Sequence, residues 1–157
     1  MVVKEQPRLD EKEQLRLDEE GIAQLRARLC EVNGDDREFD ARFDRLMEVL
    51  RVVLTRLEHG YGDEIERVMA VGDWARGAID LRSLPYDNVI IQIVLRSEER
   101  SFDLSWRIAG DVFDNLDDED ILVQFEVEAL PAWQHAVALA RASRNEEALG
   151  ISLLRRA

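Results

Sequence analysis

The sequence predicts an α/β (α+β) fold in which helices cover a small mixed sheet. Segments with a helical period of apolar residues alternate with short runs of β-branched residues, in the order α–α–β–turn–β–α–β–α. The length of 157 residues suits one domain, and an apolar content of 46% is enough to form a core. We therefore expect a domain at residues 35–157, preceded by an N-terminal helical extension at residues 1–34.

The first predicted helix covers residues 10–32, where apolar residues recur every three, four or seven positions. Asn33 and Gly34 are predicted to end it, because both tolerate the left-handed backbone conformation. Its apolar stripe includes Val32 and the four residues of a candidate interaction surface, Leu15, Ile22, Leu25 and Leu29. This stripe could pack on its own domain, pair with a second copy or dock onto another chain, and the sequence leaves these possibilities open.

A second helix is predicted to start after Asp35 or Asp36, which can cap it, and to end before His59. Its apolar residues recur at the spacing of a core-facing stripe. They are Phe39, Phe43, Leu46, Leu50, Val53 and Leu57.

Three strands are predicted from runs of β-branched and apolar residues, at residues 65–71, 89–95 and 121–127. Between the first two, the glycines of the run 72–77 mark a turn with a close backbone approach. Residues 85–88 form another turn just before the second strand.

A third helix is predicted at residues 102–116. Its expected inward residues are Phe102, Trp106, Ala109, Val112, Phe113 and Leu116. Pro131 opens a last helix that runs from residue 132 to about residue 144, because proline is favoured in the first helical turn. Residues 150–154 are predicted as a short extended tail.

Negative charge is concentrated in one segment of the chain. Residues 98–128 hold eleven carboxylates and two arginines, and so contribute −9 to a net charge of −13. The run 117–120 within it could be a solvated loop or a surface that meets a basic partner. A net charge of this sign repels phosphate backbones, so we do not expect broad, non-specific nucleic-acid binding.

The cysteine content and the apolar runs bear on the compartment. A single cysteine, Cys30, excludes a disulfide framework and a cysteine-rich zinc site in this sequence. No run approaches the ~20 apolar residues that span a bilayer, and the first residues lack the pattern of a secretory signal. We therefore expect a cytoplasmic protein with no membrane association.

The run Val71-Gly72-Asp73-Trp74-Ala75-Arg76-Gly77 resembles a known signature. In the DNA polymerase beta-like nucleotidyltransferase superfamily, a strand leads into Gly-Ser-x-Ala-Arg-Gly, and Ser-Asp-x-Asp then opens an apolar strand. The preceding helix, the Leu130-Pro131-Ala132-Trp133 run and the ending 144–151 also resemble the family. The likeness covers residues 37–154 and implies a minimal nucleotidyltransferase fold.

The resemblance implies a nucleotide-binding position at Gly72, Asp73 and Arg76. In the family, backbone N–H groups and a serine hydroxyl at this turn hold the phosphates. Here Asp73 stands where the family has serine, which places an acid against phosphate oxygens. Arg76 could contact phosphate, or it could form an ion pair with Asp73 or Asp80.

The implied metal ligands also depart from the family pattern. With a one-residue insertion in the loop, the two metal-binding aspartates of the family fall on Pro85 and Asp87, and only Asp87 is acidic. Without the insertion they fall on Leu84 and Tyr86, and neither carboxylate remains. The third acidic position falls on Gln124, with Glu126 two residues later on the same face, so the residual metal ligands are Asp87 and Glu126.

These departures lead us to expect a catalytically inactive nucleotidyltransferase-fold protein without a cofactor. It would serve as a binding or regulatory subunit for a protein partner, for example as an antitoxin. One alternative is an active enzyme that uses Mg²⁺ with ATP or another nucleoside triphosphate and transfers a nucleoside monophosphate to a protein or small molecule. A second alternative is a self-associating structural module that forms a homodimer through the first helix.

Overall fold

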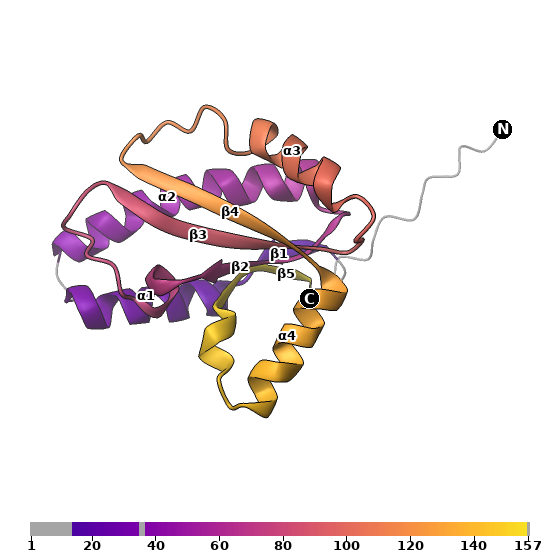
Figure 1. Ribbon diagram of the computed structural model, residues 1–157. Coiled ribbons are helices and arrows are strands. Elements are labelled where there is room, and N and C mark those ends of the chain that lie inside the picture. The colour runs from indigo at the N-terminus through magenta and orange to yellow at the C-terminus, as the bar shows by residue number, and fades with distance from the viewer. Residues whose placement is uncertain (1–13, 35–36, 157) are drawn as a thin grey trace.

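The computed structural model describes residues 14–34 and 37–156, which form a mixed sheet with helices on both faces (Figure 1). The strands are β1 (Leu15–Leu17), β2 (Ile65–Val71), β3 (Tyr86–Leu95), β4 (Ile121–Ala129) and β5 (Ile151–Arg156). The α-helices are α1 (Glu19–Asn33), α2 (Arg37–Tyr61), α3 (Ser101–Asp111) and α4 (Leu130–Ala142). Two short 3₁₀-helices, η2 (Asp73–Arg76) and η3 (Glu146–Leu149), complete the described part.

The strands lie in the order β1-β5-β2-β3-β4 across the sheet. Neighbouring strands are antiparallel except β3 and β4, which are parallel and connected through α3. The α/β (α+β) class predicted from the sequence is therefore confirmed. The extended tail predicted at residues 150–154 belongs to β5, which lies between β1 and β2 inside the sheet.

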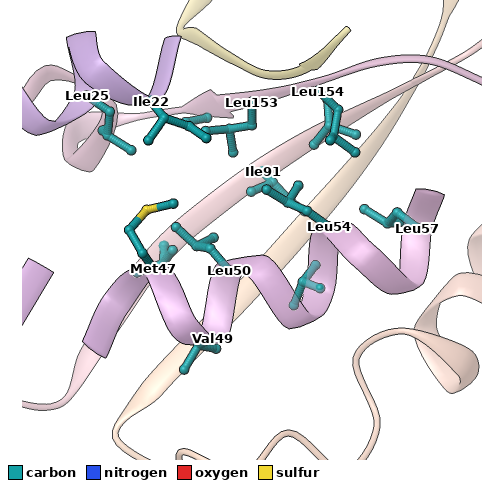
Figure 2. Packing of buried hydrophobic residues seen from close by; sticks show 14 of the residues in the cluster. Ile22, Leu25, Met47, Val49, Leu50, Leu54, Leu57, Ile91, Leu153 and Leu154 are labelled. Atoms are coloured by element: carbon teal, nitrogen blue, oxygen red, sulfur yellow. The ribbon is translucent and has the colours of Figure 1, made fainter. Parts of the chain in front are cut away.

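The first face of the sheet, the one that packs against α1, α2 and α3, carries the hydrophobic core. Alternate residues of each strand point to this face, as the two-residue period of a strand requires. Figure 2 shows Leu50 and Leu54 of α2 pointing toward Ile91 of β3, with Leu153 of β5 close by. Burying each of these side chains contributes about 1.5–3 kcal/mol, so this face supplies most of the driving force for folding.

The start of α1 differs from the prediction. The side chain of Asp18 accepts a hydrogen bond from the backbone N–H of Gly21 (3.1 Å) and caps the helix. Leu15 precedes this cap and lies in β1, paired with Arg156 of β5, so its predicted place on the helical stripe is wrong. The first residues of the predicted helix, 10–13, lie outside the described residues.

The predicted end of α1 is confirmed. Gly34 has a φ of 83°, and its N–H donates to the carbonyl of Cys30. Leu25 and Leu29 of α1 are fully buried in the same cluster as Leu50 of α2. Residues 14–34 therefore share one sheet and one core with the rest of the domain, and no separate extension is seen among them.

The helix α2 runs past its predicted end. It continues through His59 and Gly60 to Tyr61. Tyr61 is buried and its hydroxyl donates a hydrogen bond to Asp111 of α3, so packing of the last turn extends the helix beyond the glycine. The predicted caps at positions 35 and 36 lie outside the described residues.

The strands agree more closely with the sequence. The predicted limits of β2, residues 65–71, are those observed. β3 begins at Tyr86, inside the predicted turn, because the Tyr86 side chain is buried and its N–H donates to the carbonyl of Asp120 (2.7 Å). β4 begins at the predicted residue and continues to Ala129, and α4 starts with Pro131 in its first turn as predicted.

The helix α3 presents a different face to the core from the one predicted. Leu104 and Ile108 are buried, whereas Phe102, Trp106 and Ala109 are exposed. The helix ends at Asp111, and the three residues predicted inward after it do contact the core from the following loop. The prediction of Phe102 and Trp106 as core residues is wrong.

The second face of the sheet is covered only in part. Figure 1 shows α4 on the side opposite to α2. The Trp133 ring of α4 lies over Arg67 of β2, with 5.0 Å from the Arg67 Cζ to the ring centroid. Within residues 14–34 and 37–156, no helix combines the length and apolar character needed to cross a membrane.

Candidate functional site

The glycine turn predicted between the first two strands is present between β2 and β3. Gly72 has a φ of 87° and Gly77 a φ of 86°, conformations that favour glycine. The buried Trp74 lies between them, and its Nε1 donates to the carbonyl of Ile90 (2.9 Å). Packing of Trp74 on β3 therefore fixes this turn.

The predicted nucleotide-binding residues do not form a phosphate cradle. Asp73 and Arg76 are both exposed on η2. A hollow of about 260 Å³ lies between η2 and the start of β3, and its acidic lining residues are Asp73, Asp80 and Asp87. None of the described residues that line it is a lysine or arginine. Like charges about 4 Å apart repel by about 4 kcal/mol at an effective dielectric near 20, so this hollow opposes a triphosphate.

The ion pair expected for Arg76 is not formed among the described residues. Asp80 pairs instead with Arg82, with 3.2 Å between Asp80 Oδ1 and Arg82 Nε. Hydrogen bonds from the backbone and side chain of Arg82 lower the pKa of Asp80. Neither Asp73 nor Asp80 contacts Arg76, so this arginine stays exposed to solvent.

The predicted metal ligands Asp87 and Glu126 are not brought together. Glu126 pairs in register with Gln92, five residues beyond Asp87 on β3. At a rise of about 3.3 Å per residue, the backbone positions of the two residues lie about 16 Å apart along the strands. Gln92 Nε2 donates to Glu126 (3.3 Å), and Gln124 Nε2 donates to the carbonyl of Asp87 (2.9 Å). Within the described ranges, no cluster of three or more carboxylate, histidine or cysteine side chains could hold a metal ion.

The predicted interaction surface on the first helix is also not available to a partner. Its four residues, Leu15, Ile22, Leu25 and Leu29, are buried in the core of the chain itself. The sequence left packing on its own domain open, and the structure shows this arrangement. The prediction that a partner or a second copy docks on these four side chains is therefore wrong.

The structure exposes an aromatic pair on α3 that the sequence does not identify as a candidate site. Phe102 is 78% exposed and Trp106 is 69% exposed, and their rings meet edge to face with 6.4 Å between centroids. Their spacing of four residues places them on one side of the helix. A second apolar stripe of the same helical period, at Leu104, Ile108 and Val112, is the one that is buried. This competing stripe is the feature of the sequence that could have indicated an exposed aromatic pair.

The two arginines around this aromatic pair are neutralised by neighbouring carboxylates. Arg100 forms an ion pair with Glu64. Arg107 forms one with Asp103 on the same helix (3.5 Å). We refer to α3, the acidic residues just before it and the loop between α3 and β4 as the α3–β4 surface. Its exposed residues without an ion pair in the described part include Glu98, Glu99, Asp114, Asp117 and Glu119.

Part of the acidic loop is fixed to the domain. Arg45 of α2 holds Asp118 with two hydrogen bonds (2.7 and 2.9 Å) and Asp120 with a third (3.1 Å). The hydrogen bond from Arg45 lowers the pKa of Asp118. Asp117 and Glu119 alternate with these residues and are exposed, so the fixed loop presents its remaining charges outward.

Comparisons with known proteins identify no relative of this chain. No family model, no curated protein and no solved structure matches the chain. The resemblance to the nucleotidyltransferase superfamily therefore stays a prediction from the sequence.

Proposed function

We propose that this protein is a non-catalytic binding or regulatory subunit, and that its α3–β4 surface docks a basic protein partner. The observation that carries the proposal is the exposed pair Phe102 and Trp106. Large aromatic side chains in the centre of an interface supply much of its binding energy, whereas in water their exposed area is unfavourable. An adjacent aromatic pair in an acidic segment therefore favours a docking function.

The charge of the surface selects the partner. Residues 98–128 carry −9, and Arg100 and Arg107 are already engaged in ion pairs within the chain. A basic partner is attracted to such a surface, and the attraction raises its association rate. A second copy of this chain, with a net charge of −13, would be repelled. These two arguments favour a different, basic protein over a homodimer.

The positions of the acidic residues around the glycine turn argue against a nucleotidyl transfer reaction. Two metal ions in such a reaction need carboxylates that converge on the phosphates. Asp87 and Glu126 are about 16 Å apart along the sheet, and Asp73 adds negative charge at the turn. We therefore retain the nucleotidyltransferase-like scaffold as part of the proposal but assign it no transfer step.

The test compares two variants of the full chain as bait in an extract of the native cell. Phe102→Ser combined with Trp106→Ser removes the aromatic pair, and Leu139→Ser removes a similarly exposed apolar side chain from α4. We expect the wild type and Leu139→Ser to retain the same basic protein. With that protein purified, we expect the double variant to bind at least tenfold more weakly, because a central tryptophan commonly contributes about 2 kcal/mol or more.

Three outcomes would contradict the proposal. The first is equal binding of the identified protein by the double variant and by the wild type. The second is a retained protein that carries no excess of positive charge, since the surface would then not be recognised by its charge. The third is a change in the solution mass of the purified chain when the aromatic pair is removed, because the occupant would then be a second copy.

A further inference from the structure

A cavity with an unusual concentration of arginine lies on the second face of the sheet. It is bounded by α1, β2, α4 and η3 and has a volume of about 380 Å³, within the range of small-molecule sites. Its polar lining includes Gln24 and Arg28 from α1, Arg67 from β2, and Trp133 and Arg141 from α4. It shares no lining residue with the hollow at the glycine turn or with the α3–β4 surface.

Arg67 is the central group of this cavity. Its side chain is partly buried and stacks on the Trp133 ring. Among the described residues, its guanidinium forms no hydrogen bond or ion pair with a carboxylate. Burial, and then the nearby Arg155, lower the pKa of Arg67. A guanidinium removed from water without a partner is costly, so the fold retains here a charge that it does not itself satisfy.

Charges of both signs lie near Arg67, because Arg155 lowers its pKa while Asp18 and Glu66 raise it. Arg155 lies opposite it in register on β5, and Arg155 is paired with Asp18 (3.3 Å). Arg28 uses one N–H on the carbonyl of Ala75 (3.2 Å), which leaves other donors of its guanidinium available. Arg28 and Arg67 thus both keep guanidinium donors that no hydrogen bond in the described part uses.

The indole of Trp133 is a second unsatisfied group at the cavity. Its Nε1 is buried and has no hydrogen-bond partner among the described residues. Tryptophan N–H groups usually find an acceptor when they are buried. Because this N–H is buried rather than open to the cavity, an anion would accept from the arginine donors, and the Trp133 ring contributes by stacking on Arg67.

The charge of the lining selects the class of anion. Among the lining residues that the structure describes, Arg28, Arg67 and Arg141 provide three positive charges, and the exposed Glu146 provides one negative charge. The excess of about two positive charges matches a phosphomonoester, which carries about −1.5 to −2 at neutral pH, better than a monocarboxylate. The remaining lining, Met69, Val137 and Leu149, is apolar and would contact an organic group.

We propose that this cavity binds a small organic phosphomonoester, with Arg28, Arg67 and Arg141 holding the phosphate. Guanidinium groups suit phosphate because their planar donors form paired hydrogen bonds with its oxygens. Arg141 is exposed at the rim of the cavity, and Arg67 lies on the sheet at its base. The ligand would therefore enter past α4 with its phosphate directed toward β2.

Titration calorimetry of the full chain with phenyl phosphate tests this proposal, with benzoate as the matched carboxylate. We expect phenyl phosphate to bind and to raise the melting temperature, because a ligand of the folded state stabilises it. Arg141→Gln and Arg67→Gln should each weaken binding at least tenfold, or about 1.4 kcal/mol. Arg76→Gln removes the same charge from η2, outside the cavity, and should change binding less than about twofold.

The unliganded variants separate a binding role from a structural one. If Arg67 is retained for a ligand, Arg67→Gln should keep or raise the stability of the free protein, because it removes a half-buried unpaired charge. A marked loss of stability would show that stacking on Trp133 is its main role, and would overturn the proposal. So would absence of phenyl phosphate binding, equal binding of benzoate, or an equal effect of Arg76→Gln.

Discussion

The two faces of the sheet differ in how completely their groups are satisfied. On the first face, Val68, Ile91 and Ile93 are fully buried against α1, α2 and α3. On the second face, the alternate residues of the same strands include Arg67 and Gln92, and α4 covers only part of them. The buried unpaired atoms Trp133 Nε1 and Ser152 Oγ also belong to this side.

This difference separates what folds the chain from what it can bind. Close packing of apolar side chains on the first face supplies the stability. The second face retains charges and donors that cost stability unless something pairs with them. Residues kept at such a cost are more informative about function than the core is.

The largest effect that tests this contrast comes from two adjacent residues of β3. Ile91→Ala on the first face should lower the free energy of unfolding by about 2–5 kcal/mol, since it opens a cavity in a closely packed core. Gln92→Ala on the second face should change it by less than about 0.5 kcal/mol. Denaturant unfolding of both variants provides the measurement. Similar losses in both would show that the second face also stabilises the domain.

A smaller effect is expected on α3, where the same contrast applies within one helix. Leu104→Ala should cost about 2 kcal/mol, near the lower end for buried leucine, because few buried side chains hold this short helix and it can shift to fill the gap. Phe102→Ala should leave stability within about 0.5 kcal/mol, since its side chain is largely exposed. Thermal or denaturant unfolding distinguishes the two. A large loss for Phe102→Ala would support the face predicted from the sequence.

In α3, the sequence does not determine which side of the helix is buried. Its sequence contains two apolar stripes of helical period, one with Phe102 and Trp106 and one with Leu104 and Ile108. Periodicity does not say which stripe is buried, and the larger aromatic residues favoured the wrong one. Only the packing of Leu104 and Ile108 of α3 into the core decides between them.

Local features were predictable where the chain itself dictates them. The limits of β2, the turn at Gly72 and Gly77, and the end of α1 at Gly34 all follow from strand period or from glycine conformation. The strand β1 could not be predicted in this way, because it has only three residues and its partner β5 comes from the other end of the chain. Such pairing leaves little local signal.

The candidate sites were harder to predict from the sequence than the strands, because their residues come together only through contacts between distant parts of the chain. The arginines of the cavity come from α1, β2 and α4, and no spacing in the sequence relates them. Asp87 and Glu126 were grouped from a family pattern, but the register of β3 and β4 keeps them apart. A site assembled across a sheet is fixed by register and by helix placement, which a single sequence does not specify.

The smallest effect is a shift in titration that reports how dry the first face is. Both tyrosines of the chain, Tyr61 and Tyr86, belong to its core. Burial, and then the hydrogen bond to Asp111, raises the pKa of Tyr61 to about 12, and burial raises the pKa of Tyr86. We expect the tyrosinate absorbance to appear above the pH of about 10 at which an exposed tyrosine titrates. A midpoint near 10 for both would show that water reaches this side of the sheet.

The same shift makes stability depend on alkaline pH. A folded-state pKa above the unfolded value means that the folded protein holds the Tyr61 proton more tightly. The resulting stabilisation is complete below pH ~10 and is lost as the pH rises toward about 12. Tyr61→Phe should reduce this alkaline loss in the free energy of unfolding, whereas Arg67→Gln on the second face should leave its pH dependence in that range unchanged. An unaltered alkaline slope in Tyr61→Phe would mean that another group of the first face controls it.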